Sequence, residues 1–152
     1  MKLAYALLVP LLAVTLNAAA AEEPDKRPPI DKYYSNSSFQ LTICKATFKL
    51  AQSQAELATA GGTVKETPGV SSDFRGCIAN GKAEAKANLD KALRTVKKAK
   101  AQEALKAYHV AFVTALEGIV PGSAERRISY EQRQQALEGK VTEAWARFEV
   151  ER

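Results

Sequence analysis

Few residues in this chain could carry out chemistry, and His109 is its single histidine. An imidazole acts as a catalytic base when a nucleophile lies beside it and a carboxylate orients it. On a helix, the residues one turn before and after His109 are Leu105 and Val113, so no carboxylate is placed to orient the ring. We therefore expect a surface or boundary imidazole, no catalytic residue and a protein that is not an enzyme.

Metal and cofactor sites are not indicated either. Two thiols and one distant histidine do not provide the four ligands of a usual zinc site. Met1 is the only methionine, so the exported chain has no histidine and methionine pair to hold haem. The pair Gly61-Gly62 lacks the lysine that a phosphate-binding loop requires. We expect no metal and no cofactor.

The two cysteines, Cys44 and Cys77, are expected to form a disulfide. An even number of cysteines in a small exported chain is typical of such a bond. Closing a loop of about 33 residues would stabilise the fold by roughly 3.5 to 4 kcal/mol in the chain-entropy model. That contribution is large for a small domain.

The first 21 residues have the pattern of a secretory signal peptide. Lys2 supplies the positive charge, the stretch 3–16 supplies a short apolar core, and Ala19-Ala20-Ala21 supplies a cleavage site before Glu22. An apolar run of about 14 residues is too short to span a bilayer. We expect a periplasmic or secreted protein, with a flexible arm at 22–37 and a single helical domain at 38–152.

Basic residues are concentrated between positions 82 and 106, where eight lysines and arginines stand against three acidic residues. One interpretation is a solvated helix face. The other is a surface for an anionic partner: a lipid headgroup, an acidic protein or an unfolded acidic client. Nucleic acid is not expected, because export separates the protein from it and no aromatic residues alternate with the lysines. The candidate surface comprises Lys86, Lys91, Arg94, Lys97, Lys98 and Lys100.

These basic residues would lie on a long central helix. Apolar or small residues return every three or four positions from Ala85 to Ile119 without a proline between them, which predicts one helix at 82–119. Pro121-Gly122 ends it. Before it we expect a short helical turn at 73–79 and a bend at Asn80-Gly81.

Two further helices complete the predicted fold. A row of N-cap residues followed by an apolar stripe indicates a first helix at about 38–60. The disulfide requires the loop after it to run back along this helix, because Cys44 lies far from the helix end. A last helix at about 123–150 follows the short Pro-Gly turn, antiparallel to the central one. The expected fold is all-α: a three-helix bundle built on a long antiparallel helical hairpin and braced by the disulfide-linked first helix.

Three functional hypotheses follow. The first is an exported binding or chaperone-like accessory protein that acts through helical surfaces, including the basic central helix. The alternative is an inhibitor or immunity protein directed at a cell-envelope enzyme such as a peptidoglycan hydrolase. The third is a homodimer that buries the stripe of Leu89, Leu93 and Val96, should it lack a partner within one chain.

Overall fold

The computed structural model describes residues 25–59, 74–122 and 124–152, and their regular structure is entirely helical. It contains α1 (Pro29–Thr59), α2 (Phe74–Leu93), α3 (Ala99–Glu117) and α4 (Arg127–Glu151). The all-α class is confirmed. The three-helix arrangement is wrong, because the described residues form four helices.

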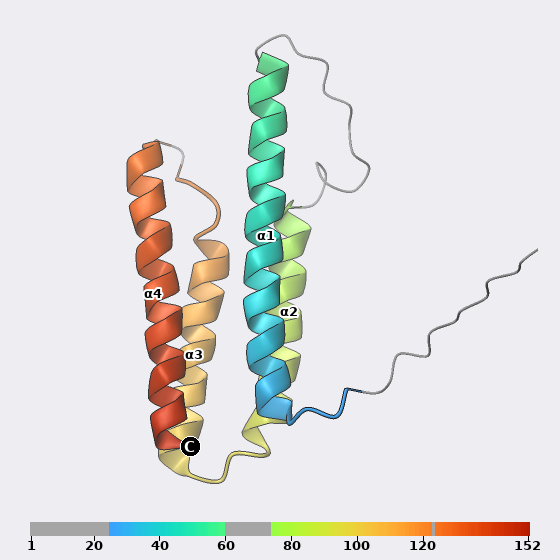
Figure 1. Cartoon of the computed structure of the whole chain (residues 1–152), viewed down its shortest axis with the longest axis vertical. Helices are drawn as coiled ribbons and strands as arrows, with labels where there is room; N and C mark the ends of the chain where they lie inside the picture. The colour runs from blue at the N-terminus through green and yellow to red at the C-terminus, as the bar shows by residue number, and fades with distance from the viewer. Residues whose placement is uncertain (1–24, 60–73, 123) are drawn as a thin grey trace, which may run out of the picture.

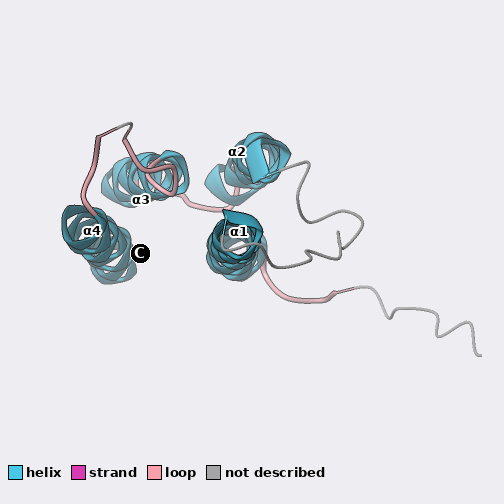
Figure 2. Ribbon diagram, turned by 90° about the horizontal axis from the view of Figure 1, so that it is seen from above, coloured by secondary structure: helices cyan, strands magenta, loops and turns pink. Residues whose placement is uncertain are grey.

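Consecutive helices run alternately up and down (Figure 1). Seen from the end, they follow the order α4, α3, α2, α1 around the bundle (Figure 2). α1 packs along α2 and α3 packs along α4, while α2 and α3 share a smaller interface. The backbones of α1 and α4 do not pack against each other, so the bundle has one open side.

α1 begins at Pro29, well before the expected start at residue 38. Residues 29–37, predicted to be part of a flexible arm, are its first turns. Proline is favoured at the first position of a helix, where its missing N–H is not needed. The serines that resemble N-caps lie inside the helix instead: Ser37 Oγ donates to the Tyr33 carbonyl at 2.8 Å.

The expected helix at 82–119 is interrupted at residues 94–98, between α2 and α3. Thr95 N donates to the Ala92 carbonyl at 3.0 Å and Thr95 Oγ1 donates to it at 2.7 Å, which closes the end of α2. Val96 is buried in the turn. Helix propensity would allow a continuous helix here, but a straight helix would leave half of its apolar stripe without a partner. Folding back buries both halves, and Leu89, Val96 and Leu105 all lie in the core of one chain.

Asn80-Gly81 does not bend the chain, because α2 runs through it from Phe74. Gly81 is buried, and a Cβ atom added there would lie 2.7 Å from Gln40 Cγ on α1. The glycine therefore allows a close approach of two helices rather than a turn.

The last helix starts later than expected, at Arg127 rather than residue 123.

The predicted signal peptide at 1–21 lies outside the described residues, as does the predicted path of the loop at 60–73. Phe74, the first residue of α2, lies 5.0 Å from Phe48 between ring centroids. α2 therefore begins beside the middle of α1 rather than beside its end.

The Cys44–Cys77 disulfide is confirmed, and it joins α1 to the first turn of α2. Most of the surrounding core comes from α2 and α3, with single large side chains from the outer helices. The buried cluster contains Tyr33, Cys44, Ala85, Leu89, Ala92, Val96, Ala101, Ala104, Leu105, Tyr108, Phe112, Leu116, Ile119 and Phe148.

Candidate functional site

The open side of the bundle faces the viewer between α4 and α1 in Figure 1. Hollows lined by side chains of both helices make it a groove. Side chains cross it at three levels. Near the start of α1, the rings of Tyr34 and Trp145 stack at 4.2 Å. In the middle, Lys45 forms an ion pair with Glu138. Farther along α1, Phe48 lies 6.0 Å from the Tyr130 ring.

The groove has a hollow between the first two bridges and another beyond the third. The lower hollow, of about 200 Å³, is lined by Tyr34, Ser38, Leu41, Thr42, Tyr108, Phe112, Glu138, Val141 and Thr142. The upper hollow, of about 580 Å³, is lined by Phe48, Lys49, Gln52, Ser53, Glu56, Pro121, Glu125, Arg127, Tyr130 and Glu131. Both mix aromatic rings with hydrogen-bonding side chains, so both offer contacts to a partner that is partly apolar.

An aromatic cluster forms the floor of the groove. Tyr33 and Tyr108 are fully buried and meet edge to face at 5.6 Å, and Trp145 packs against Tyr108 at 5.1 Å. The Tyr33 hydroxyl and His109 Nδ1 are 2.8 Å apart, which ties α1 to α3. These contacts hold the two sides of the groove at a fixed separation.

The ionisation of this cluster favours its neutral forms. Burial lowers the pKa of His109 below its usual 6.5. Burial also raises the pKa of Tyr33, and it raises the pKa of Tyr108 to about 12, although the nearby Ser37 hydroxyl acts in the opposite direction. The hydrogen bond between the Tyr33 hydroxyl and His109 therefore joins two neutral groups, and the tautomer of the ring sets its direction. At neutral pH neither tyrosine is an activated nucleophile.

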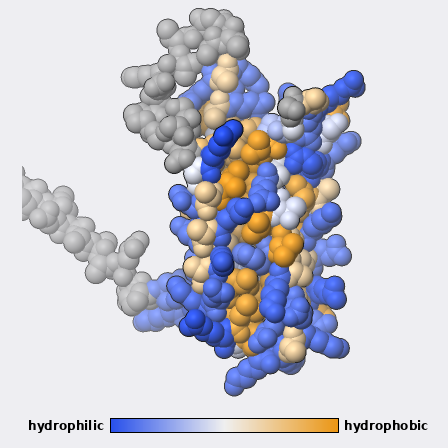
Figure 3. All heavy atoms as spheres, turned by 180° about the vertical axis from the view of Figure 1, so that it is seen from behind, coloured by the Kyte–Doolittle hydropathy of each residue, from blue (hydrophilic) through white to orange (hydrophobic). Residues whose placement is uncertain are grey.

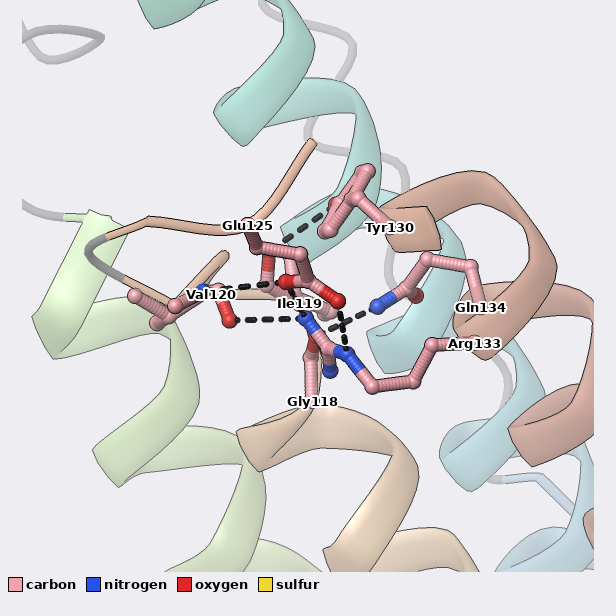
Figure 4. A network of polar contacts seen from close by, with 8 residues as sticks. Gly118, Ile119, Val120, Glu125, Tyr130, Arg133 and Gln134 are labelled. Atoms are coloured by element: carbon pink, nitrogen blue, oxygen red, sulfur yellow. Dashed lines mark hydrogen bonds and ion pairs between the residues drawn. The ribbon is translucent and has the colours of Figure 1, made fainter. Parts of the chain in front are cut away.

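At one end of the groove, the loop between α3 and α4 is held in place by Arg133 (Figure 4). Its guanidinium donates to the carbonyl of Gly118 at 2.6 Å and to that of Val120 at 3.2 Å. It also donates twice to Glu125, at 2.7 and 2.6 Å. The Arg133 hydrogen bonds, followed by one from the Gly122 N–H, lower the pKa of Glu125 to about 2.

Two neighbours of Arg133 complete this network. Gln134 donates to the Gly118 carbonyl, and the Tyr130 hydroxyl donates to the Ile119 carbonyl at 2.9 Å. Four side-chain donor groups thus satisfy three backbone carbonyls at the end of α3, which otherwise would have no helical partner. The fixed loop carries exposed apolar side chains, Val120 and Pro121, and Ile128 follows in the first turn of α4.

The six residues of the predicted basic surface are all exposed. Lys86 and Lys91 lie on α2, Arg94, Lys97 and Lys98 lie in the turn after it, and Lys100 lies in the first turn of α3. The turn thus brings four of the six together at one end of the bundle.

Other basic residues reach the same end. Lys100 shares a hollow between α3 and α4 with Arg147, and Arg152 lies 3.8 Å from Asp31 at the start of α1. Among the described residues, Lys45, Lys82 and Lys106 have ion-pair partners, whereas none of the six predicted residues does. Their charge is therefore directed to solvent.

The back of the molecule carries a different surface. Figure 3 shows a lengthwise band of apolar side chains there, bordered by hydrophilic ones. Val113 and Leu93 are partly buried against the core, while Val110 is exposed on the outside of α3. Val113 and Leu93 thus contribute to the packing of the core.

Sequence patterns did not reveal the groove or the Arg133 network. Tyr34, Trp145 and Arg133 act through contacts between helices, which periodicity within one helix does not show. One signal was available for the network: Glu125 and Arg133 flank the start of the last helix within eight residues of each other. Within the described ranges, no group of three or more His, Cys, Asp or Glu residues is placed to hold a metal ion.

Fold and site define a four-helix bundle with one disulfide and an open lengthwise groove. Among the helices described, none is both long enough and apolar enough to cross a membrane. Comparisons with models of protein families, with curated protein sequences and with solved structures found no match. Function is therefore inferred from the surfaces of the chain itself.

Proposed function

We propose that this chain is an exported, non-enzymatic binding or chaperone-like accessory protein that holds segments of a partner polypeptide on its helical surfaces. The observation that supports this is the groove between α1 and α4, which is bridged by side chains but not closed by backbone packing. Export is supported by the signal-like residues 1–21 and by a disulfide, a bond typical of oxidising compartments.

The upper hollow is the preferred contact for a client segment. Its volume of about 580 Å³ falls within the range of roughly 300 to 1,000 Å³ that is typical of binding pockets. Phe48 and Tyr130 provide aromatic contact for an apolar side chain. Lys49, Gln52 and Glu131 at the margin provide donors and acceptors for a backbone or a polar side chain.

The basic end adds selectivity for acidic partners. Its unpaired cations create a positive potential that increases the encounter rate with acidic segments and weakens as salt is added. Capture in the groove and attraction to the basic end are separable, because the first depends on shape and apolar contact and the second depends on charge.

Suppression of client aggregation at a stoichiometric ratio tests the groove. Gln52→Trp fills the upper hollow from an exposed position, and Gln132→Trp on the exposed surface of α4 is the matched control. We expect the first variant to lose protection by about tenfold and the control to keep it. Loss in both variants, or in neither, would contradict capture in the groove.

Charge reversal tests the basic end. We expect Lys97→Glu with Lys98→Glu to weaken protection of an acidic client severalfold at low salt, and much less at high salt. Lys140→Glu with Arg126→Glu reverses two exposed charges away from the basic end and serves as the control. An equal effect of both changes would show that only net charge matters.

A second candidate is an inhibitor or immunity protein for a cell-envelope enzyme such as a peptidoglycan hydrolase. The loop fixed by Arg133 favours it, because a preformed loop with exposed Val120 and Pro121 binds with little loss of conformational entropy. Affinity purification from the cell envelope discriminates the two: one stoichiometric enzyme, lost with Val120→Asp, supports the inhibitor, and many clients support the chaperone.

A further inference from the structure

α1 has an apolar stripe on its outer face, in addition to the face that contributes to the core. Phe39, Ile43, Leu50 and Leu57 are 65, 38, 45 and 55 % exposed. The exposed small residues Ala46 and Ser53 fall between them, so the six positions are spaced alternately by four and three. Steps of four and three in alternation repeat every seven residues, which is the heptad pattern of a coiled coil. We call these six positions the outer stripe.

We propose that the outer stripe binds a second copy of this chain, with the two α1 helices antiparallel about a two-fold axis. In that arrangement Phe39 meets the second copy's Leu57, and Ile43 meets its Ser53. Ala46 meets Leu50. At the two inner pairs a large side chain meets a small one, and the outer pair brings two large side chains together, which is the complementarity that close packing requires. The interface is self-complementary, as two-fold symmetry demands.

The charges around the stripe favour a second copy over a membrane surface. No position of the stripe is charged, and one margin consists of Gln40, Thr47 and Gln54. The other margin carries a single lysine, Lys49, between Thr42 and Glu56. A helix that lies on anionic lipid needs several basic residues along its polar face, and most basic residues of the predicted surface are at the α2–α3 turn instead.

The sequence also argues against coverage by the segment that follows α1. Residues 60–73 contain only two large apolar residues, Val64 and Val70, so they do not provide a matching heptad. The outer stripe faces away from the core side of α1, where Tyr33 and Cys44 are buried. Ser53 of the stripe and Lys49 on its margin also line the upper hollow, so a bound second copy would lie along one wall of the groove.

The size of the contact sets the expected affinity. The stripe from Phe39 to Leu57 is about 27 Å long at 1.5 Å per residue. A single helix pair of that length buries an area near the lower limit for specific interfaces. We expect a dissociation constant of about 1 to 100 µM.

Lys49 gives the proposal a distinctive salt dependence. In the antiparallel register, the Lys49 side chains of the two copies are neighbours on one flank of the interface. Their repulsion opposes association, so the dimer should become tighter as salt rises and about twofold tighter in Lys49→Gln. Association driven by opposite charges would weaken with salt.

Sedimentation equilibrium of the full chain from about 1 µM to 1 mM tests the proposal. We expect a monomer–dimer equilibrium that is weakened at least tenfold by Ile43→Gln with Leu50→Gln and tightened by Lys49→Gln. Val110→Gln, an equally exposed change on α3, should have no effect. Circular dichroism checks that each variant retains its helices.

Three results would overturn the proposal. The first is a monomer at all concentrations. The second is a dimer that tolerates the double substitution in the outer stripe or weakens with Lys49→Gln, since it would use another surface. The third is a monomer whose stripe instead mediates binding to phosphatidylglycerol vesicles, which would make a membrane the occupant.

Discussion

At the scale of single residues, the half-buried His109 links protonation to the stability of the fold. Burial lowers its pKa below 6.5, with Asp90 acting against this shift and Lys86 adding to it. Between the folded pKa and 6.5, the unfolded chain binds more protons than the folded chain. The stabilising contribution is therefore complete above pH 6.5 and is lost as the pH falls.

We accordingly expect the melting temperature to fall from pH 7.5 to pH 5, and to fall less in His109→Gln. The acidic groups Asp25 and Glu125 have pKa values of about 2 in the folded protein, and their ordinary values of 3.8 and 4.5 also lie below pH 5, so they contribute little in this range. Tyr33→Phe removes the hydrogen bond to Nδ1 and should cost about 1 kcal/mol at pH 7.5. Thermal unfolding of both proteins at the two pH values tests the role of His109. If the melting temperature of His109→Gln falls as much as that of the wild type, other groups cause the pH dependence.

A second residue-scale prediction concerns Arg133, which holds the loop at 118–126. Arg133→Ala should raise the pKa of Glu125 from about 2 towards its usual 4.5, because the main cause of the shift is lost. It should also increase amide hydrogen exchange in the loop about tenfold and leave that of α1 and α2 unchanged. Arg133→Lys retains a charge without the planar arrangement of donors and should give an intermediate pKa. An unaltered Glu125 titration, followed by NMR, would contradict this role.

At the scale of helices, the sequence predicts the helical class and the disulfide better than it predicts where each helix begins and ends. The all-helical class and the Cys44–Cys77 bond follow from periodicity and from cysteine number, both of which are local signals. The predicted start of α1 is wrong because Pro28-Pro29 suggests an extended chain, whereas burial of Tyr33 against Tyr108 stabilises a helix there. The break at 94–98 contains neither proline nor glycine, so it depends on packing between α2 and α3.

The candidate sites also differ in how well the sequence predicts them. Exposure of the basic residues follows from their alternation with apolar positions. The groove cannot be predicted from such a pattern, because it depends on two helices that are distant in sequence and meet only through side chains such as Tyr34 and Trp145. From the sequence alone, Arg133 resembles any solvated arginine, because its carbonyl partners lie outside its own helix.

The disulfide gives a prediction at this scale, because it lies within the pair of α1 and α2 and leaves the pair of α3 and α4 without a covalent link. Cys44→Ser with Cys77→Ser should destabilise the protein by roughly 3 to 4 kcal/mol. Hydrogen exchange should show α1 losing protection first, while α3 and α4 remain helical longest. Equal loss of protection in all four helices would indicate one cooperative unit instead.

At the scale of the whole molecule, the arrangement is two helix pairs joined by the 94–98 turn and bridged across the groove. The smaller α2–α3 interface and the absence of α1–α4 backbone packing within the described helices make the open side the place where the pairs separate most readily. Trp145, the only tryptophan, lies in one of the three bridges and reports on this separation.

We expect Tyr34→Ala to remove the stacked bridge and destabilise the fold by about 1 kcal/mol. The same change should increase quenching of Trp145 fluorescence by acrylamide about twofold, since one face of the indole is uncovered. Tyr130→Phe, which retains the ring beside Phe48 and loses only its bond to the Ile119 carbonyl, should leave quenching unchanged. Quenching that does not respond to Tyr34→Ala would place the opening elsewhere on the bundle.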